Sequence, residues 1–329
     1  MANELSEKKF TTGLSEWTNT LTGLVTSDFE TCGVQFDEYS KQCAMNAMSS
    51  IFQLVKADEK TNISEIDTSN LREVVGQCAS LKLNANAVPR ECYFSLRSKK
   101  IDGKYVKVVE MGIEGDGNDA LLKNYGEGVK EVFPCWIVKE GDVFVYPKHR
   151  GIEVTPPEWE EMGKSDKATR IVYPVLLDDN SVVYLISERD SVKTNLMAHI
   201  RNNMLNETFG ICENRYKASD KQKEEIAAKK EVIFEELRKC ETLEDMLSCE
   251  SAKPFISAAW LDTPESMIVR KMRNNAIKKF RKNYNQMAKQ SILQLDESYQ
   301  VMQEEIAENE NSIPFEIDEA TIIDSEDVK

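Results

Sequence analysis

The chain has 329 residues, of which 41% are hydrophobic and 30% are charged, and its formal net charge at pH 7 is −15. This composition is typical of a globular protein with polar appendages, and the length suffices for one large domain or two small ones. The chain contains no run of about 18 apolar residues and no apolar signal core near Met1, so we expect a cytoplasmic protein without a membrane partner.

The cysteines and histidines do not form a recognisable metal-binding pattern. None of the eight cysteines falls in a C-x-x-C pair, and the only histidines are His149 and His199. A long chain without a signal sequence is expected to keep its thiols reduced. We therefore expect no zinc site and no cofactor.

The first part of the chain predicts helices. Residues 1–30 show weak patterning and are expected to be poorly ordered. Residues 36–57 fit a helix with one apolar face, and Asp67 opens a second helix that runs to about residue 81. Residues 1–67 are therefore assigned to an N-terminal helical region.

The middle of the chain predicts antiparallel strands. Residues 91–97 and 105–111 are rich in β-branched and aromatic side chains around a turn at residues 101–104, which indicates a hairpin. A glycine-rich loop and a short helix at about residues 118–125 follow. Further strands are expected over residues 131–139, 142–146, 169–177 and 181–187, of which the last two form a second hairpin.

The last third of the chain combines helices with an acidic end. Helices are expected over residues 188–205, capped by Ser187, and over residues 217–240. Residues 296–329 carry twelve acids and one lysine, a net charge of −11, which leaves −15 − (−11) = −4 for the rest. We expect residues 291–329 to form a mostly disordered tail, which either solubilises the protein, competes with DNA or docks a partner.

Residues 267–290 hold eight Lys and Arg residues and no acid, which is unusual in an acidic chain. A helical projection of this segment as far as Tyr284 gives one apolar stripe, made of Ile268, Met272, Ala276, Phe280 and Tyr284. The opposite face holds cations, namely Arg270, Lys271, Lys278, Arg281 and Lys282. Exposed helices usually mix charges of both signs, so this segment predicts a surface for a polyanion.

The first hairpin also mixes cations with aromatic rings, a pattern that suits single-stranded nucleic acid, although core aromatics with surface lysines would look the same. We predict that hairpin and basic helix share a groove. The candidate DNA-contacting residues are Arg90, Tyr93, Arg97, Lys104, Tyr105, Lys107, Arg270, Lys271, Lys278, Lys279, Arg281 and Lys282.

Patterns for nucleotide or metal chemistry are weak. Gly115-x-Gly117-x-x-Ala120 resembles a dinucleotide fingerprint, but the acids around it would repel a pyrophosphate. Gly163-Lys164-Ser165 lacks the earlier glycine of a phosphate-binding loop. We therefore predict no catalytic residues; a metal-dependent nuclease, and a scaffold that binds an acidic protein, remain the alternatives.

An ordered series of segments resembles the RecT-like family of phage single-strand annealing proteins, which includes Red-beta. The clearest is V-K-E-G-D-V-F at Val138–Phe144, which matches the family pattern V-x-x-G-D-x-F. The others are Leu71–Leu83, Arg90–Leu96, Met111–Gly115, Leu121–Gly126 and Trp260–Met267. The usual K-T-A-I-R-R is replaced by a segment that ends in Lys278 and Lys279, which keep the charge but not the bidentate geometry of arginine.

The resemblance implies an α+β fold, with a small twisted antiparallel sheet packed with helices. It assigns subunit contacts to the N-terminal helical region, residues 1–67, and places an annealing core at residues 68–290, with residues 206–255 as an insertion. It also implies ATP-independent annealing of single-stranded DNA in phage recombination, without catalysis, by a ring or helical filament of identical subunits. The implied partners are a phage exonuclease and a host single-strand-binding protein. We expect that neutralising Lys278, Lys279, Arg281 and Lys282 abolishes DNA binding and leaves the fold intact.

Overall fold

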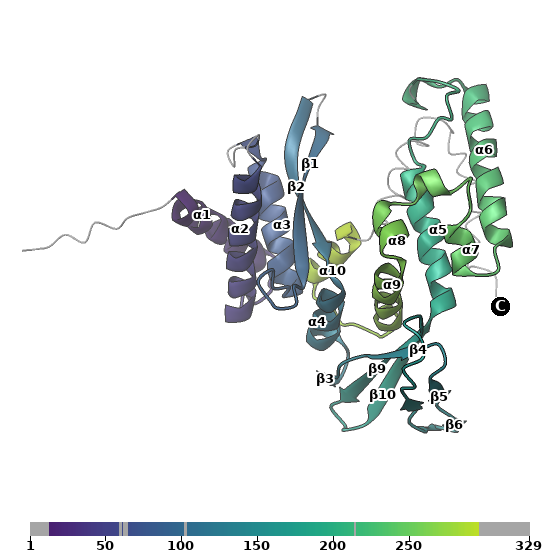
Figure 1. Ribbon diagram of the computed structural model, residues 1–329. Coiled ribbons are helices and arrows are strands. Elements are labelled where there is room, and N and C mark those ends of the chain that lie inside the picture. The colour runs from purple at the N-terminus through teal and green to yellow at the C-terminus, as the bar shows by residue number, and fades with distance from the viewer. Residues whose placement is uncertain (1–12, 59–60, 62–64, 102–103, 214, 296–329) are drawn as a thin grey trace, which may run out of the picture.

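The computed structural model describes residues 13–58, 61, 65–101, 104–213 and 215–295. These residues form two lobes, each around its own hydrophobic core (Figure 1). The first lobe contains the N-terminal helices, the first hairpin and the last helix of the described chain. The second lobe contains the second sheet and the helices that cover it. The predicted α+β class with small antiparallel sheets is confirmed.

Three helices open the first lobe: α1 (Gly13–Thr31), α2 (Glu38–Ala57) and α3 (Thr68–Leu81). The two predicted helices correspond to α2 and α3, and Asp67 caps α3 by accepting a hydrogen bond from the Ser69 amide. The expected weak order of residues 1–30 is wrong for residues 13–30, because α1 buries a stripe of apolar side chains in the core. Residues 1–12 lie outside the described residues.

The first hairpin consists of β1 (Cys92–Ile101) and β2 (Lys104–Ile113), paired in register as far as Ile101 and Lys104. One face of the hairpin packs against α2 and α3, with Cys92 fully buried. The Asn70 side chain binds the backbone of Val109 on the β2 edge, with hydrogen bonds of 2.7 and 3.0 Å. This confirms the predicted hairpin and fixes it to α3.

Helix α4 (Gly115–Tyr125) joins the lobes, because Leu121 belongs to the first core and Leu122 to the second. The predicted glycine-rich loop before it is wrong, since the helix begins at Gly115 rather than near residue 118. A Cβ atom at Gly117 would lie 2.0 Å from the carbonyl oxygen of Glu91. The glycine therefore allows the first turn of α4 to approach the hairpin base closely.

The second sheet is antiparallel, with β9 (Ala168–Leu177) at its centre and β10 (Val182–Glu188) on one side. On the other side β9 pairs with β3 (Val129–Val132) and β4 (Trp136–Lys139). The sequence predicted β3 and β4 as one strand, but Pro134 interrupts the ladder because it has no N–H to donate. The β9–β10 hairpin is confirmed.

Two short ribbons extend from this sheet. In the first, β5 (Val143–Val145) pairs with β8 (Glu158–Glu160), and in the second, β6 (His149–Arg150) pairs with β7 (Glu153–Val154). The sequence predicted only β5 among these strands. The other three are two or three residues long, which is too short for an alternating pattern to be recognised.

Five helices complete the second core, and the last of them along the chain packs against β9 and β10 of the sheet. They are α5 (Val192–Asn203), α6 (Asp220–Lys239), α7 (Leu243–Leu247), α8 (Ala258–Asp262) and α9 (Pro264–Lys278). The predicted Ser187 cap of α5 is wrong, because the short 3₁₀ turn Arg189–Ser191 precedes the helix. Within the described part of the chain, none of the helices has the length and apolar character needed to cross a bilayer.

The basic stretch is not one continuous helix, contrary to the prediction. Helix α9 ends at Lys278, and α10 (Gln286–Leu295) is a separate helix that packs on α3 in the first lobe. Phe280 packs against the second core, whereas Tyr284 packs against the first, with its ring 5.0 Å from that of Tyr125. The helix therefore ends where the chain leaves one core for the other.

The two segments that connect the lobes run side by side. Gly126 and Lys282 form an antiparallel bridge, the Glu127 amide donates to Arg281 O at 3.0 Å, and the Asn283 amide donates to Tyr125 O at 2.7 Å. The second lobe is thus inserted between α4 and α10 of the first lobe. The first five residues of the predicted tail region, 291–295, belong to α10, and residues 296–329 lie outside the described residues.

Candidate nucleic-acid interface

The hairpin presents an aromatic ring on its outer face. Tyr93 is 38% exposed and lies opposite Gly112 in the strand register. A Cβ atom at Gly112 would lie only 2.2 Å from the Tyr93 ring, so the ring lies over this glycine of the neighbouring strand β2. An exposed ring held in this way offers a flat surface on which a base can stack. The sequence pattern identified Tyr93 but not Gly112, which only the cross-strand register reveals.

The candidate cations of the hairpin do not share one face. Arg97 lies on the same face as Tyr93 and contacts Glu110 at 3.5 Å, with 65% of its side chain exposed. Arg90 is exposed just before β1. Lys107 pairs with Ser98 on the opposite face. Lys104 lies in β2, as does Tyr105, but their side chains are outside the described residues.

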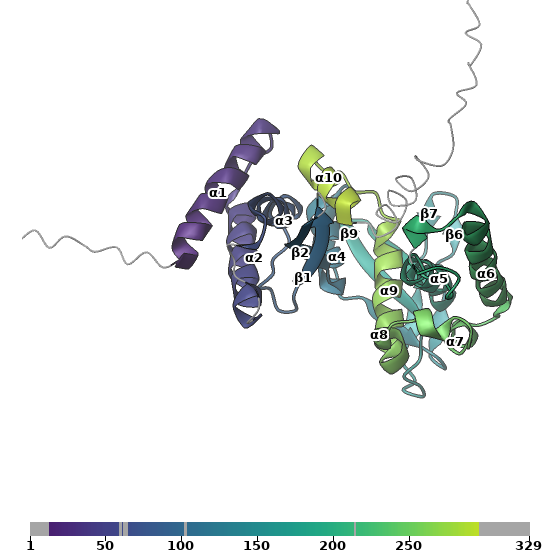
Figure 2. The ribbon, with the colours of Figure 1, turned by 90° about the horizontal axis from the view of Figure 1, so that it is seen from above.

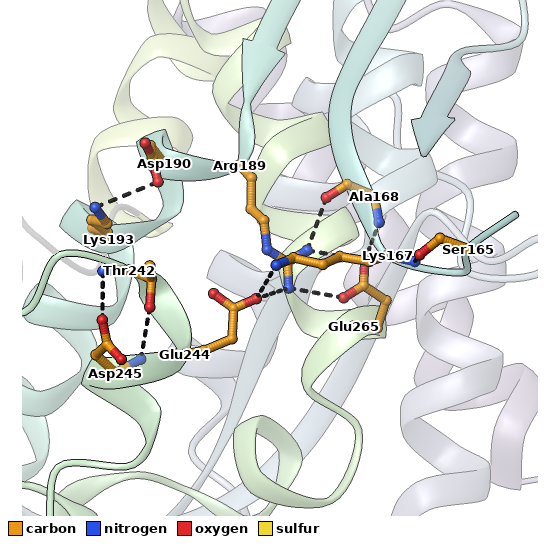
Figure 3. Close-up of polar contacts among 10 residues, drawn as sticks. All are labelled: Ser165, Lys167, Ala168, Arg189, Asp190, Lys193, Thr242, Glu244, Asp245 and Glu265. Carbon is orange, nitrogen blue, oxygen red and sulfur yellow. Dashed lines mark hydrogen bonds and ion pairs between the residues drawn. The ribbon is translucent and has the colours of Figure 1, made fainter. Parts of the chain in front are cut away.

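The start of α9 is fixed by the ion-pair network around Arg189 (Figure 3). Arg189 Nη1 donates to Ala168 O at 2.9 Å and to Glu265 Oε1 at 3.0 Å, and Nη2 contacts Glu265 and Glu244, each at 3.0 Å. Only 13% of the Arg189 side chain is exposed. Lys167 adds a contact of 3.0 Å to Glu244. The network ties the end of β10 to α7 and to the first turn of α9.

Two partly exposed arginines of α9 contact acids in α4 or directly before it. Arg270 donates to Ile113 O at 3.1 Å and lies 3.4 Å from Glu114. Arg273 contacts Asp116 at 3.0 Å and Asp119 at 2.6 Å. These contacts join the middle of α9 to the hairpin base and to α4, so the charges of both arginines are largely offset within the protein.

Arg273 also belongs to a buried polar network. Its Nε donates to the Tyr173 hydroxyl at 2.7 Å, and that hydroxyl donates to Asp119 at 2.8 Å. Burial raises the pKa of Asp119, and the charges of Arg273 and the bond from Tyr173 offset this only in part. Burial likewise opposes the charge of Arg273, but its contacts with Tyr173 and Asp119 raise its pKa. We assign Arg273 a role in joining the lobes.

The cations where the chain crosses between lobes form a separate set, which we call the crossover cluster: Lys278, Lys279, Arg281, Lys282 and Lys289. All are exposed except Lys282, which is half-buried. Arg281 contacts Glu127 at 2.8 Å, with 83% of its side chain exposed. Within the described residues, neither Lys279 nor Lys289 contacts an acid. This cluster is therefore the most cationic part of the basic stretch.

Lys282 has a structural role in this cluster. Its ammonium donates to Ile277 O at 2.7 Å and to Phe280 O at 3.2 Å, and so caps the C-terminus of α9. Burial, together with the charge of Lys278, lowers the pKa of Lys282 to about 8. The half-buried ammonium is thus held against carbonyl groups, and its substitution would disturb α9 as well as the surface charge.

The predicted candidates therefore fall into two groups. Arg90, Tyr93 and Arg97 lie on the hairpin, and both views place α9 on the side of the hairpin away from α2 and α3 (Figures 1 and 2). Four members of the crossover cluster lie at or just after the C-terminal end of α9, and the fifth, Lys289, lies in α10. Arg270 and the half-buried Lys271 occupy the part of α9 between the two groups. The contacts between α9, α4 and the hairpin base connect the groups, but not all twelve residues line one surface.

Three acids at or near the hairpin could be considered as metal ligands of a nuclease, and all three form ion pairs. Glu110, Glu114 and Asp116 each contact an arginine. Across residues 13–295, where described, no group of three or more His, Cys, Asp or Glu side chains is placed to hold a metal ion. Comparison of the chain with protein-family models, with curated proteins and with solved structures gives no match.

Proposed function

We propose that this protein binds single-stranded DNA and promotes annealing of complementary strands without ATP. The crossover cluster carries this proposal, because it concentrates exposed cations in a chain that is acidic elsewhere. Phosphate backbones are the polyanions that such a surface binds most readily. The exposed ring of Tyr93 favours binding of single-stranded over double-stranded DNA, since unpaired bases can stack on it.

Annealing requires no bond chemistry in the protein. A cationic surface that holds two strands lowers the repulsion between their phosphates, and base pairing then supplies the free energy and the sequence specificity. The proposal accordingly includes no catalytic residue and no cofactor. It also includes a cytoplasmic location and a homo-oligomer, either a ring or a helical filament. A phage exonuclease and a host single-strand-binding protein complete the proposed partners.

The test is a triple variant of the full chain in which Lys278, Lys279 and Arg281 become Gln. Lys282 stays unchanged because its ammonium caps α9. We expect the affinity for a dye-labelled oligonucleotide to fall about 10- to 100-fold near 0.1 M salt, and the slope of log affinity against log salt to decrease by about 2. Annealing of two complementary labelled oligonucleotides, without ATP, should slow in parallel.

The matched control removes three exposed lysines of α6, namely Lys221, Lys223 and Lys239, with the same change of charge. Helix α6 lies at the edge of the second lobe, beyond α5 from α9 (Figure 1). This control should keep the wild-type salt slope. Wild-type affinity in the first variant, or an equal loss in both, would contradict the proposal. Binding of an acidic protein without any DNA binding would instead support a scaffold.

A further inference from the structure

The crossover cluster has more positive charge than its surroundings neutralise. Arg281 contacts Glu127, whereas no acid in the described part of the chain contacts Lys279 or Lys289. The lowered pKa of Lys282 has the charge of Lys278 as one of its causes, which shows that these cations repel one another. An anion that bound here would relieve this repulsion.

The chain carries an acidic segment a few residues after this surface in the sequence. Residues 296–329 follow α10 directly and hold twelve acids and one lysine. Helix α10 has ten residues and is therefore about 15 Å long. An extended chain spans about 3.3 Å per residue, so about five residues suffice to return along α10. Glu304 and the acids after it are thus within reach of the crossover cluster.

We propose that the acidic segment 296–329 docks on the crossover cluster of its own chain and competes there with DNA. Because the segment is tethered, its effective concentration at the cluster is on the order of millimolar. Strands with high phosphate density displace it, whereas weak polyanions do not. The docking itself needs no DNA, but the competition rests on the proposed function.

The first experiment detects docking directly in the full chain without DNA. A water-soluble carbodiimide joins a carboxylate to an amine only where the two are in contact, and mass spectrometry identifies the joined residues. We expect crosslinks from segment 296–329 to Lys278, Lys279 and Lys289 in about 50 mM salt, with strong loss at about 0.5 M. The exposed lysines Lys221, Lys223 and Lys239 of α6 serve as internal controls.

Crosslinks that are absent, or equally frequent at the α6 lysines, would overturn the docking. Crosslinks found only between two copies would overturn docking within one chain. Acetylation of Lys278 and Lys279 gives a second readout in a variant whose twelve tail carboxylates are changed to amides. We expect faster acetylation of both lysines in that variant, whereas unchanged rates would overturn the docking.

The second experiment compares oligonucleotide binding by the wild-type chain and by the amide variant. We expect the variant to bind single-stranded DNA about tenfold more tightly at about 50 mM salt, with the difference disappearing as salt is raised. Equal affinities would overturn the competition. If neither chain binds DNA while the crosslinks persist, the proposed function fails and the docking stands, so the two failures are distinguishable.

Discussion

Each lobe has an apolar core, but the first lobe is joined mainly by apolar contacts between segments that are far apart in the sequence, whereas the second lobe adds ion pairs of half-buried arginines. In the first core, Ala288 of α10 is fully buried where α10 packs on α3. In the second lobe, Arg189 and Arg273 have 13% and 20% of their side chains exposed, and each contacts two acids. The second lobe should therefore respond more strongly to loss of a single charge and to pH.

The largest effect is expected from Arg189→Met, which removes the centre of the network that holds α9. The substitution leaves Glu265 without its arginine and frees Ala168 O, so the second lobe should lose about 3 kcal/mol of its free energy of unfolding. Hydrogen exchange should show faster exchange in β9, β10 and α9 but not in α2 and α3. Equal acceleration in both lobes would show that they unfold as one unit. Arg97→Met, at an exposed ion pair, is the control and should change little.

The next largest effect concerns the joint between the lobes. Gly117→Ala places a Cβ atom 2.0 Å from the carbonyl oxygen of Glu91, which is backbone and cannot rotate away. We expect a loss of about 2 kcal/mol in denaturant unfolding as α4 separates from the hairpin base. Gly76→Ala in α3 is the control, because a Cβ atom there meets nothing within 4 Å. That change should stabilise the helix by up to about 1 kcal/mol.

A smaller effect on binding tests whether the first lobe contacts DNA at all. Tyr93→Leu removes the ring and should weaken oligonucleotide binding about 5- to 30-fold. Gly112→Ala keeps the ring but forces it off the strand, so a similar loss is expected. Ser95→Ala, on the same hairpin face, should bind normally. Normal binding by the Tyr93 variant would confine the interface to the second lobe and the crossover.

The smallest effect is a pH dependence of the second lobe. Burial raises the pKa of Glu244, but the hydrogen bond from Lys167 and the charge of Arg189 outweigh burial and leave the pKa below 4.5. Glu244 therefore contributes stability above pH 4.5 and loses it as the pH falls through its folded-state pKa. Because the side chain is 44% exposed, Glu244→Gln should cost less than about 1 kcal/mol near pH 7. This difference should shrink in unfolding curves as the pH falls below 4.5, and a constant difference from pH 3 to 7 would contradict the ionic role.

Periodicity and turn residues were enough to predict the long elements. The α2 and α3 stripes, both long hairpins and the capping of α3 by Asp67 follow from local patterns. The prediction of one continuous helix over the basic stretch was wrong for a non-local reason. Its stripe from Ile268 to Tyr284 has helical spacing throughout, but Phe280 and Tyr284 pack into different cores. Helical spacing of apolar residues in a sequence does not show that those residues pack into two different cores.

The sequence was enough to list the cations near the candidate interface, but not to predict which groups of the protein each cation contacts. Charge counts predicted Arg270 as a DNA contact and did not reveal that Glu114 and Ile113 O contact it. The half-burial of Lys282 was equally hidden, because its carbonyl partners come from the chain reversal after α9. Partners contributed by distant segments decide which cations face solvent, and a single sequence does not specify those partners.

The return of α10 to the first lobe has a consequence for synthesis on the ribosome. Gln77 and Ser80 of α3 bond to Gln294 and Ser291 of α10, with distances of 3.0 and 2.9 Å. At 5–20 residues per second, α10 emerges on the order of 10 to 30 s after α4, when the second lobe has already been translated. Until then the nascent first lobe exposes the apolar surface that Ala288 will cover. Chaperones that act on nascent chains would bind that surface before α10 covers it.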